Sequence, residues 1–559
     1  MHRVVVLTGH TCVGKSRLAE ILQNRQGFLR LKTSDVVSKI ASQRGRPTDR
    51  SGLQQLGDEL DAELGDDWVY KETLKTLEGH KGPKNLVVDS IRTEKQLAFF
   101  RSSRQLEVIH VHLYASKEHI LERARVKHGD DTDYERADII KREHDITSFR
   151  NDADVRINTD FTDSEDTYVR VAARLHLFPS PDSRCVDVLV GGQFGSEGKG
   201  HISAFLSGEY DVLIRVGGPN AGHTVSGQDE IYTYHQLPSG TKDTDAEILL
   251  GPGMTIHVET LLKEIEECEI DEERLFIDPQ AMIIEDSDKE FEGGLKERVS
   301  STGSGSGSAA ARRILGRGNK ETKLAKDVPE LAKFVGEQAP YRGKTLRRLR
   351  RAYSGNKSIL LEGTQGSGLS IYHGEYPYVT SRDTNVAGCL AEAGISPRRL
   401  RKVILVVRTT PIRVANPLNK DGNEAGTSGT LKHETDFDEV KKRSGLTTDL
   451  RSLEKTSTTK RDRRVGWFDW EQFHQSCILN GPTDIALTFA DYINSKNSAA
   501  RRFEQLSENT IKFVEELERV SHVPVSLISI RFPRTDLERK DLRGIIDRRS
   551  WRTRRNVPK

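Results

Sequence analysis

The sequence predicts an α/β protein that consists of two successive modules. Two apolar runs, at residues 4–8 and 186–190, each lead into a glycine-rich loop and then into residues with helical periodicity. Residues 178–183 separate the two patterns with two prolines and no apolar period, which is typical of a linker. Repeated strand, loop and helix patterns favour parallel sheets with helices on both faces. We therefore expect one module over residues 1–177 and another over residues 184–534.

The composition is that of a globular protein large enough for several cores. The chain has 559 residues, of which 35% are hydrophobic, and a net charge of +2. No apolar run is long enough to span a membrane, and the first run is too short for a signal peptide, so we expect a cytoplasmic protein. The five cysteines lack the spacing of zinc sites or disulfide frameworks. The near-neutral charge gives no reason to expect a nucleic-acid partner, and we expect residues 535–559 to form a basic, solvated tail.

The first glycine-rich loop is a complete Walker A motif. Residues 9–16 read Gly-His-Thr-Cys-Val-Gly-Lys-Ser. Gly9 and Gly14 allow backbone N–H groups to surround phosphate oxygens. Lys15 would reach the terminal phosphates, and Ser16 would ligate Mg²⁺. The first module is therefore predicted to bind a nucleoside triphosphate.

The motifs that follow this loop resemble those of the small nucleoside monophosphate kinases. The resemblance rests on the segments 33–35, 85–92 and 151–155. It implies that Asp35 lies in the acceptor-nucleotide region and that Asp89 and Arg92 lie near the phosphates and Mg²⁺. It also assigns the arginine-rich segment 123–142 to a lid, although a solvated helix face would give the same pattern. No motif identifies the acceptor of the kinase.

A second glycine-rich loop opens the second module. Residues 193–201 read Gln-Phe-Gly-Ser-Glu-Gly-Lys-Gly-His. Glycines Gly195, Gly198 and Gly200 let backbone N–H groups approach an anion, and the following helix adds the positive end of its dipole. Lys199 supplies a formal charge. Such a turn can also be a plain strand-to-helix connection, so its interpretation depends on the rest of the chain.

The second module resembles the adenylosuccinate synthetase family over residues 184–534. The loop is similar to the family signature Gln-Trp-Gly-Asp-Glu-Gly-Lys-Gly-Lys, with Ser196 at the catalytic Asp and His201 at the last Lys. Further segments that match in order are 217–224, 235–240, 362–366, 373–381 and 457–467. The resemblance implies a homodimeric ligase that uses Mg²⁺ and a nucleoside triphosphate, ATP or GTP, to join L-aspartate to a purine nucleotide.

The resemblance also assigns roles to individual residues. The catalytic residues would be Ser196, Lys199, His223 and Gln365. The triphosphate would contact Gly195, Glu197, Gly198, Gly200 and Asp491, and Mg²⁺ would contact Ser196 and Gly222. The purine nucleotide and L-aspartate would contact Asn220, Thr302, Arg313, Thr380, Thr458, Thr459, Arg461 and Arg463. Arg312 is an equal candidate to Arg313 for reaching the neighbouring subunit's nucleotide.

Several of these segments also have a simpler interpretation. A lone histidine after a strand, such as His223, is usually structural. The Gly/Ser run 301–308 has the composition of a flexible linker. The basic run 460–464 could be a solvated surface, but arginines and hydroxyls in one loop suit a dicarboxylate, because arginine makes bidentate pairs with carboxylates.

Three positions depart from the family pattern. Ser196 cannot replace an aspartate as a base or as an anionic ligand. Phe489 stands where the family has a lysine, and the segment 529–531 lacks the usual glycine, so ATP or dATP becomes an alternative to GTP. Ser196 also resembles phage variants that act on dGMP, because a hydroxyl leaves room for a 2-amino group. An enzyme that acts on IMP with another base is the other interpretation.

The expected reaction has two steps. The γ-phosphate of the donor moves to the six-oxygen of the purine, and the aspartate amine then displaces phosphate. Lys199 would stabilise the transferring group, His223 would act as an acid on the oxygen, and Gln365 would orient the base. The alternative is a catalytically altered module that binds nucleotide as a sensor and is fused to an active kinase.

Overall fold

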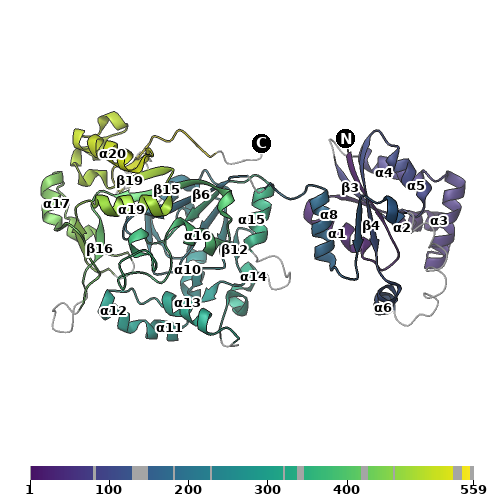
Figure 1. The fold of residues 1–559 in the computed structure, drawn as a ribbon, viewed down its shortest axis with the longest axis horizontal. Helices are drawn as coiled ribbons and strands as arrows, with labels where there is room; N and C mark the ends of the chain where they lie inside the picture. Colours follow the sequence, from purple (N-terminus) through teal and green to yellow (C-terminus); the bar gives the residue numbers. More distant parts are fainter. Residues whose placement is uncertain are drawn as a thin grey trace. The chain divides into compact units, whose positions relative to one another are not determined.

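The computed structural model describes residues 2–79, 84–128, 149–180, 183–226, 230–318, 322–335, 345–416, 426–457, 460–532 and 544–553. The chain divides between Phe178 and Pro179 into two compact units. We call these the N-terminal unit and the C-terminal unit and describe each by itself (Figure 1).

The N-terminal unit contains a parallel sheet with the strand order β2-β3-β1-β4-β5. Its strands are β1 (His2–Thr8), β2 (Leu29–Lys32), β3 (Asn85–Asp89), β4 (Leu106–Tyr114) and β5 (Val155–Asn158). The first loop follows the central strand β1, and Leu7 near the end of β1 pairs with Asp89 at the end of β3. Residues at the carboxyl ends of these two strands therefore lie side by side.

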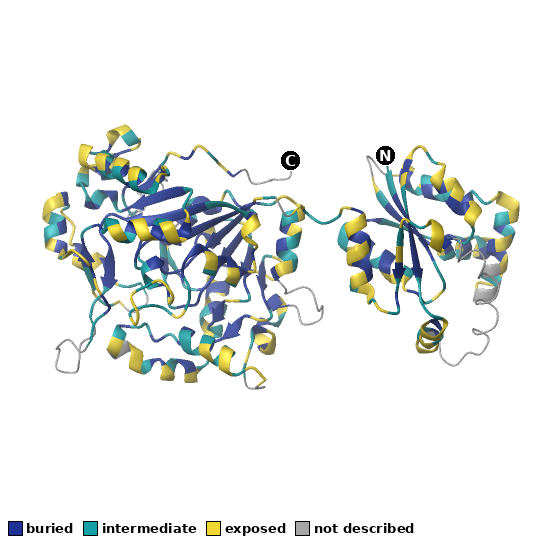
Figure 2. Cartoon of the chain, viewed as in Figure 1, coloured by how far each residue is buried: buried dark blue, intermediate teal, exposed yellow. Residues whose placement is uncertain are grey.

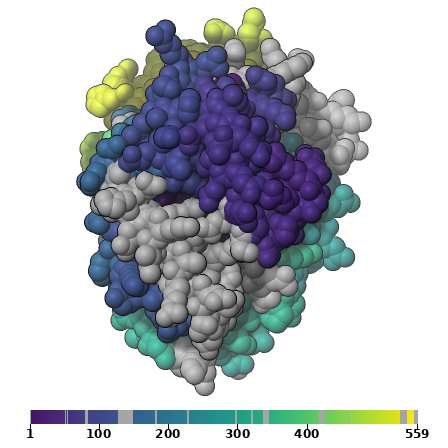
Figure 3. Space-filling model, turned by 90° about the vertical axis from the view of Figure 1, so that its right-hand side faces the viewer, coloured from purple at the N-terminus to yellow at the C-terminus, as the bar shows by residue number. Residues whose placement is uncertain are grey.

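Helices cover both faces of this sheet, as expected from the sequence. They are α1 (Lys15–Gln26), α2 (Thr33–Gln43), α3 (Arg50–Leu64), α4 (Trp68–Glu78), α5 (Glu94–Arg101), α6 (Lys117–His128) and α8 (Ser164–Arg174). Val4 and Val6 face a core shared with α2 to α5, whereas Val5 and Leu7 face a core shared with α1 and α8. This alternation is the period of two expected for a buried strand. Figure 3 shows one face of the surface that encloses this sheet, in purple and blue.

The C-terminal unit contains a larger sheet with the strand order β12-β10-β7-β14-β6-β15-β19-β20-β21. In that order the strands are Leu275–Ile277, Glu247–Leu250, Val212–Arg215, Ile359–Glu362, Val186–Gly191, Leu400–Arg408, Asp484–Thr488, Val525–Ser529 and Ile545–Asp547. All neighbouring pairs are parallel except β20 and β21. The loops that follow β7, β14, β6, β15 and β19 therefore meet at one edge of the sheet.

The C-terminal unit has helices on both faces of this sheet and further helices outside these two layers (Figure 2). They are α9 (Lys199–Ser207), α10 (Val258–Glu267), α11 (Asp286–Phe291), α12 (Gly293–Val299), α13 (Ser306–Leu315), α14 (Ala332–Val335), α15 (Thr345–Ser354), α16 (Val386–Ala393), α17 (Phe437–Ser444), α18 (Leu450–Leu453), α19 (Trp470–Asn480) and α20 (Glu508–Ser521). The core on one face contains side chains of α15, α16, α19 and α20, and the core on the other contains side chains of α9.

Short strands form three smaller ladders beside the large sheet. They are β8 (His223–Ser226) with β9 (Ile231–Tyr234), β11 (Thr255–Ile256) with β13 (Met282–Ile283), and β18 (Arg463–Gly466) between β16 (Ile412–Val414) and β17 (Glu434–Thr435). Two of these ladders carry predicted site residues, because β8 begins at His223 and β18 begins at Arg463.

The prediction of a solvated basic tail is wrong for the part of it that the structure describes. Residues 545–547 form β21, which pairs antiparallel with β20, and Ile545 and Ile546 are buried. The Arg549 guanidinium is also buried, and its pairs with Glu209 and Asp547 at 2.7 and 2.8 Å compensate the burial of its charge. Charge counting missed the two isoleucines that supply a buried edge strand.

Candidate active sites

The Walker loop joins β1 to α1. Gly9 has φ 129, and a Cβ at this position would lie 1.9 Å from the carbonyl oxygen of Leu113, so a side chain does not fit. Gly14 caps α1 with φ 97. The amine of Lys15 donates to the carbonyl oxygens of Gly9 and His10 at 2.7 and 2.6 Å. The lysine thus lies over its own loop, at the positive end of α1.

Asp89 lies at the end of the neighbouring strand. Its carboxylate accepts a hydrogen bond from the Arg30 guanidinium at 2.6 Å. Ser16 in the first turn of α1 and Asp89 both offer oxygen donors of the kind that Mg²⁺ uses together with phosphate oxygens. These side chains fit the metal that the Walker motif implies.

Arg92 reaches α3, and Asp35 lies in the first turn of α2. A Cβ on Gly57 would lie 2.6 Å from the Arg92 guanidinium, so that glycine makes room for the arginine. Asp35 is exposed and pairs with Lys32 at 2.7 Å. Of the predicted lid, residues 129–142 lie outside the described residues.

The second glycine-rich loop joins β6 to α9. Gly195 and Gly198 have φ 95 and 79, and Gly198 caps α9. Glu197 is fully buried, and its carboxylate accepts from the backbone N–H groups of Gln193 and Gly195 at 2.9 and 2.8 Å. Its other oxygen lies 2.7 Å from the amine of Lys199. Glu197 therefore stabilises the loop from its buried side, whereas the sequence analysis predicted that it contacts the triphosphate.

His223 packs against the start of α9 and forms a buried pair with Glu362. A Cβ on Gly200 would lie 2.8 Å from the His223 Cβ atom. The His223 Nδ1 atom is 2.5 Å from the Glu362 carboxylate, which also accepts from the Ser239 hydroxyl and backbone N–H at 2.6 and 2.7 Å. The His223 Nε2 atom is buried and has no hydrogen-bond partner among the described residues.

The charges of this pair follow from its surroundings. Burial lowers the pKa of His223 to about 4, and Arg215 adds to this effect while Glu362 opposes it. Burial alone would raise the pKa of Glu362, but His223, Arg215 and Ser239 outweigh it and hold the pKa at about 2. Because the ionised carboxylate can only accept, Nδ1 carries the proton of the neutral imidazole. Nε2 is then the atom left to meet a substrate.

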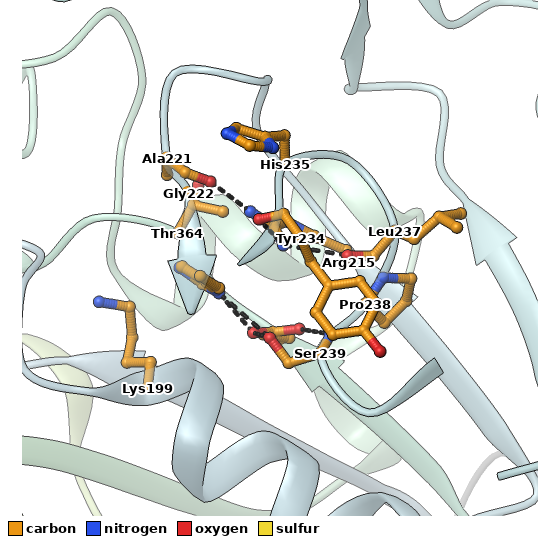
Figure 4. A network of polar contacts seen from close by, with 12 residues as sticks. Lys199, Arg215, Ala221, Gly222, Tyr234, His235, Leu237, Pro238, Ser239 and Thr364 are labelled. Carbon is orange, nitrogen blue, oxygen red and sulfur yellow. Dashed lines mark hydrogen bonds and ion pairs between the residues drawn. The ribbon is translucent and has the colours of Figure 1, made fainter. Parts of the chain in front are cut away.

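Arg215 arranges the two loops around this pair. It ends β7, is fully buried, and donates to the carbonyl oxygens of Ala221 at 2.6 Å and of Tyr234 and Leu237 at 3.3 and 3.0 Å (Figure 4). The sequence analysis gave no role to Arg215 or Glu362. The available signal was a charged residue at the carboxyl end of an otherwise apolar strand, which is costly unless the charge is paired.

Gln365 and Asn220 meet beside the second loop. The Gln365 amide donates to the Asn220 side-chain oxygen at 3.0 Å and accepts from the Thr364 hydroxyl at 3.1 Å. A Cβ on Gly195 would lie 2.9 Å from the Gln365 Cα atom. The loops after β7, β14 and β6 therefore converge on one place.

The loop that carries Arg461 and Arg463 contacts two other loops, at Gly222 and at Ser301. The Ser457 hydroxyl donates to the carbonyl oxygen of Gly222 at 2.7 Å. The Arg461 guanidinium donates to the carbonyl oxygen of Ser301 at 3.3 Å. Thr458 and Thr459 lie outside the described residues.

The Gly/Ser segment 301–308 is not a flexible linker in the structure. It leads into α13, where the buried Glu292 carboxylate accepts from the backbone N–H groups of Gly305 and Gly307 at 2.8 and 2.6 Å. A Cβ on Gly307 would lie 3.0 Å from the side chain of Ser381. The segments of Thr302 and Thr380 are therefore neighbours.

Arg313 and Arg312 are both engaged within their own chain. Arg313 donates to the carbonyl oxygen of Pro252 at 2.7 Å. Arg312 pairs with Asp288 and Glu285 at 2.7 and 2.8 Å.

The residues predicted to contact Mg²⁺ at the donor end of the site offer neutral oxygen donors. Across the described ranges, no cluster of three or more His, Cys, Asp or Glu side chains is arranged to hold a metal ion. Ser196 and the Gly222 carbonyl offer neutral oxygens, which fits Mg²⁺ held mainly by phosphate oxygens. Asp491 lies in the short helix η7 (Ala490–Tyr492) that follows β19.

Each unit has a glycine-rich loop at the carboxyl edge of a parallel sheet, and the loop of the C-terminal unit has a buried lysine and a His–Glu pair beside it. These features define a nucleotide-dependent enzyme with two nucleotide-binding units.

No helix in the described ranges has the length and apolar character needed to cross a membrane.

Comparison with known proteins identifies the family of the C-terminal unit. The adenylosuccinate synthetase family model matches residues 188–328 and 315–499, which together make up more than half of the chain. The chain belongs to the adenylosuccinate synthetase family, and its C-terminal unit is an adenylosuccinate synthetase-like ligase. A second family model, described as an AAA domain, matches residues 5–144.

Relatives and solved structures agree with this assignment. Adenylosuccinate synthetases of Methanocaldococcus jannaschii and Pyrococcus horikoshii are each 35% identical, over 61% and 65% of this chain and 93% and 98% of their own. The fully ligated enzyme of Plasmodium falciparum covers 66% of this chain and 100% of its own at 24% identity, with a TM-score of 0.52. A cyanophage S-2L succinoaminodeoxyadenylate synthetase, solved with dGMP and dATP, covers 65% of this chain and 99% of its own at 27% identity, with a TM-score of 0.50.

Proposed function

We propose that the C-terminal unit condenses L-aspartate with the six-position of a purine nucleotide at the expense of a nucleoside triphosphate. The observation that carries this proposal is the convergence of four loops at one sheet edge. Gln365 with Asn220, the His223–Glu362 pair and Lys199 lie there, and Ser457 brings the arginine loop to Gly222.

The first chemical step moves the γ-phosphoryl group of the donor to the six-oxygen of the purine and releases the nucleoside diphosphate. Lys199, at the start of α9, stabilises the charge of the transferring group. Bound phosphates raise the pKa of His223, so that a protonated Nε2 donates to the oxygen while Glu362 holds Nδ1. Mg²⁺, when bound, neutralises the phosphate oxygens.

In the second step the aspartate amine attacks carbon six and expels inorganic phosphate. Arg461 and Arg463 hold the carboxylates of L-aspartate, because guanidinium groups pair with carboxylates in two-point contacts. Gln365, fixed by Asn220, orients the base through its amide. The products are the nucleoside diphosphate, inorganic phosphate and the succinylamino-purine nucleotide.

The acceptor that we propose is a guanine nucleotide, dGMP or GMP. Ser196 supports it, because a half-buried hydroxyl replaces the carboxylate that would crowd a 2-amino group. The relative solved with dGMP, at 27% identity, adds support. IMP is the competing acceptor.

The donor that we propose is ATP or dATP. The Phe489 ring, which stands at the position of a lysine in the family, lies beneath the Arg408 guanidinium at 3.9 Å and offers no charge of its own to a guanine base. The same relative was solved with dATP as an energy donor.

We further propose that the N-terminal unit is a nucleotide kinase and that the chain forms a homodimer. Lys15 in the Walker loop and the Asp89–Arg30 pair beside it support the first proposal. Three exposed apolar side chains on α11 and α13 support the second, since a second copy could cover them: Phe291, Ile314 and Leu315. Sedimentation of the full chain tests the dimer.

A ligase assay with full-length protein tests the main proposal. IMP, GMP, dGMP and dIMP are each offered with L-aspartate and with ATP, dATP or GTP, and the product is identified by mass. We expect a succinylamino product from dGMP or GMP with an adenine donor. Nucleotide binding without turnover of any combination would instead support a sensor.

A further inference from the structure

Glu454 forms a buried cluster that the proposed reaction has not yet used. It directly follows α18 and is 5% exposed. One of its carboxylate oxygens accepts from the Arg408 guanidinium and from the Tyr492 hydroxyl, both at 2.8 Å. The other accepts from the Arg463 guanidinium at 3.0 Å. All three partners therefore donate charge-assisted hydrogen bonds to one carboxylate.

The cluster connects three segments that the proposed function places around the substrates. Arg408 also donates to the carbonyl oxygen of Ser196 at 3.2 Å, which joins the cluster to the phosphate loop. Arg463 belongs to the arginine loop, and Tyr492 lies in η7 after β19. Glu454 is the residue common to all three.

The two arginines depend on Glu454 to different degrees. Arg408 keeps other contacts, with the Ser196 carbonyl oxygen and with the rings of Phe489 at 3.9 Å and Tyr492 at 5.7 Å. Among the described residues, Glu454 is the only side chain that forms an ion pair with Arg463. Loss of Glu454 would therefore release Arg463 far more than Arg408.

The charge of Glu454 is fixed by these contacts. Burial alone would raise its pKa, but Arg408, Arg463 and Tyr492 outweigh burial and hold the pKa at about 2. The carboxylate is therefore ionised at any working pH. It cannot serve as a proton donor in the reaction, which leaves an orienting role.

We propose that Glu454 is a positioning residue that holds the Arg463 guanidinium in the orientation that receives L-aspartate. This inference rests on the proposed ligase function. Since a buried carboxylate between two guanidiniums fixes the plane of each, Arg463 is presented to the substrate already ordered. Glu454 itself touches no substrate.

Two physical roles for Glu454 predict opposite results. If it only neutralised positive charge, its removal would leave more positive charge beside the substrate and would strengthen binding of L-aspartate. If it positions Arg463, its removal would weaken that binding. A purely structural role would change the KM of the triphosphate as much as the KM of L-aspartate.

The experiment compares Glu454→Gln with Glu434→Gln in the full chain. Glu434 pairs with Arg464, the residue next to Arg463 on β18, but this pair is partly exposed. It is a matched control, because each variant removes one carboxylate that pairs with an arginine of β18. For Glu454→Gln we expect the KM of L-aspartate to rise roughly tenfold or more, with the KM of the triphosphate little changed and both values unchanged in the control.

Tyr492→Phe keeps every charge and removes one hydrogen bond to Glu454. We expect it to raise the KM of L-aspartate in the same direction and by less, so it decides the matter if Glu454→Gln fails to fold. An unchanged or lower KM for L-aspartate, or an equal rise for both substrates, would overturn the inference while leaving the ligase function intact. Wild-type protein that neither ligates L-aspartate nor is stabilised by it would overturn the ligase function itself.

Discussion

Buried carboxylates in the C-terminal unit lie beside basic side chains. Glu197 pairs with Lys199, Glu362 with His223, and Glu454 with two arginines. A buried carboxylate is stable only with such partners, because desolvation favours the neutral form. Their cationic and hydrogen-bonding partners hold the pKa of Glu362 and of Glu454 low, whereas burial, against the pull of Glu362, keeps His223 neutral in the absence of substrates.

Protonation of His223 predicts how stability depends on pH. Its folded-state pKa of about 4 lies below the ordinary value of 6.5, so between these values the unfolded chain binds a proton that the folded chain does not. Its contribution is fully present above pH 6.5 and is lost as the pH falls toward 4, by about 2 kcal/mol between pH 7 and pH 5. We expect His223→Asn to reduce this loss in denaturant unfolding followed by tryptophan fluorescence.

Exposed His474 provides the control for this measurement. His474→Asn should retain the wild-type difference between pH 7 and pH 5. A His223→Asn variant with the full wild-type difference would show that the imidazole is not kept neutral by its surroundings.

Ser196→Asp tests the proposed acceptor. A carboxylate beside the ring N–H suits a base without a 2-amino group and crowds one that has it. We expect the ratio of kcat/KM for IMP over dGMP to rise roughly tenfold or more, since one lost or crowded buried hydrogen bond commonly costs about 1–3 kcal/mol. Wild-type protein that uses IMP well and ignores guanine nucleotides would contradict the argument from space.

The elements that support the sites were partly readable from sequence. Apolar runs that lead into glycine-rich loops predicted β1 with α1 and β6 with α9, because local sequence determines both strand and turn. The His223–Glu362 pair was not predicted, since its partners are 139 residues apart and meet only through the order of strands in the sheet. Strand β21 was missed because two isoleucines were outweighed by the surrounding arginines.

The edge strand β21 can be tested through Ile546. This side chain is 5% exposed and belongs to the core that also contains α20. Ile546→Ala should destabilise the C-terminal unit by about 2–4 kcal/mol, the usual cost of emptying such a site. Denaturant unfolding measures this cost, and Arg552→Ala, at a side chain that is 71% exposed, should cost far less. Equal values for the two variants would mean that β21 does not contribute to the core.

At the scale of the whole molecule, two units with separate cores each carry one phosphate-binding loop. Each loop has its own lysine, and each lysine hydrogen-bonds to carbonyl oxygens of its own loop. The two proposed activities should therefore be separable within one chain.

Lys15→Ala tests this separation. We expect it to abolish phosphoryl transfer by the N-terminal unit, because the lysine is the charge that meets the terminal phosphates, and to leave aspartate ligation unchanged. Both activities are measured on the same full-length preparation, with exposed Lys39→Ala as the control. Loss of both activities in Lys15→Ala alone would contradict two independent sites.

The central claim is that the C-terminal unit activates the six-oxygen of a purine by phosphorylation before L-aspartate attacks. A guanine nucleotide labelled with ¹⁸O at the six-position tests this claim directly. If the oxygen is phosphorylated and then expelled, the label must appear in the inorganic phosphate released with each succinylamino product. Label recovered in water, or phosphate released without label, would contradict the mechanism that we derive from Lys199, His223 and Glu362.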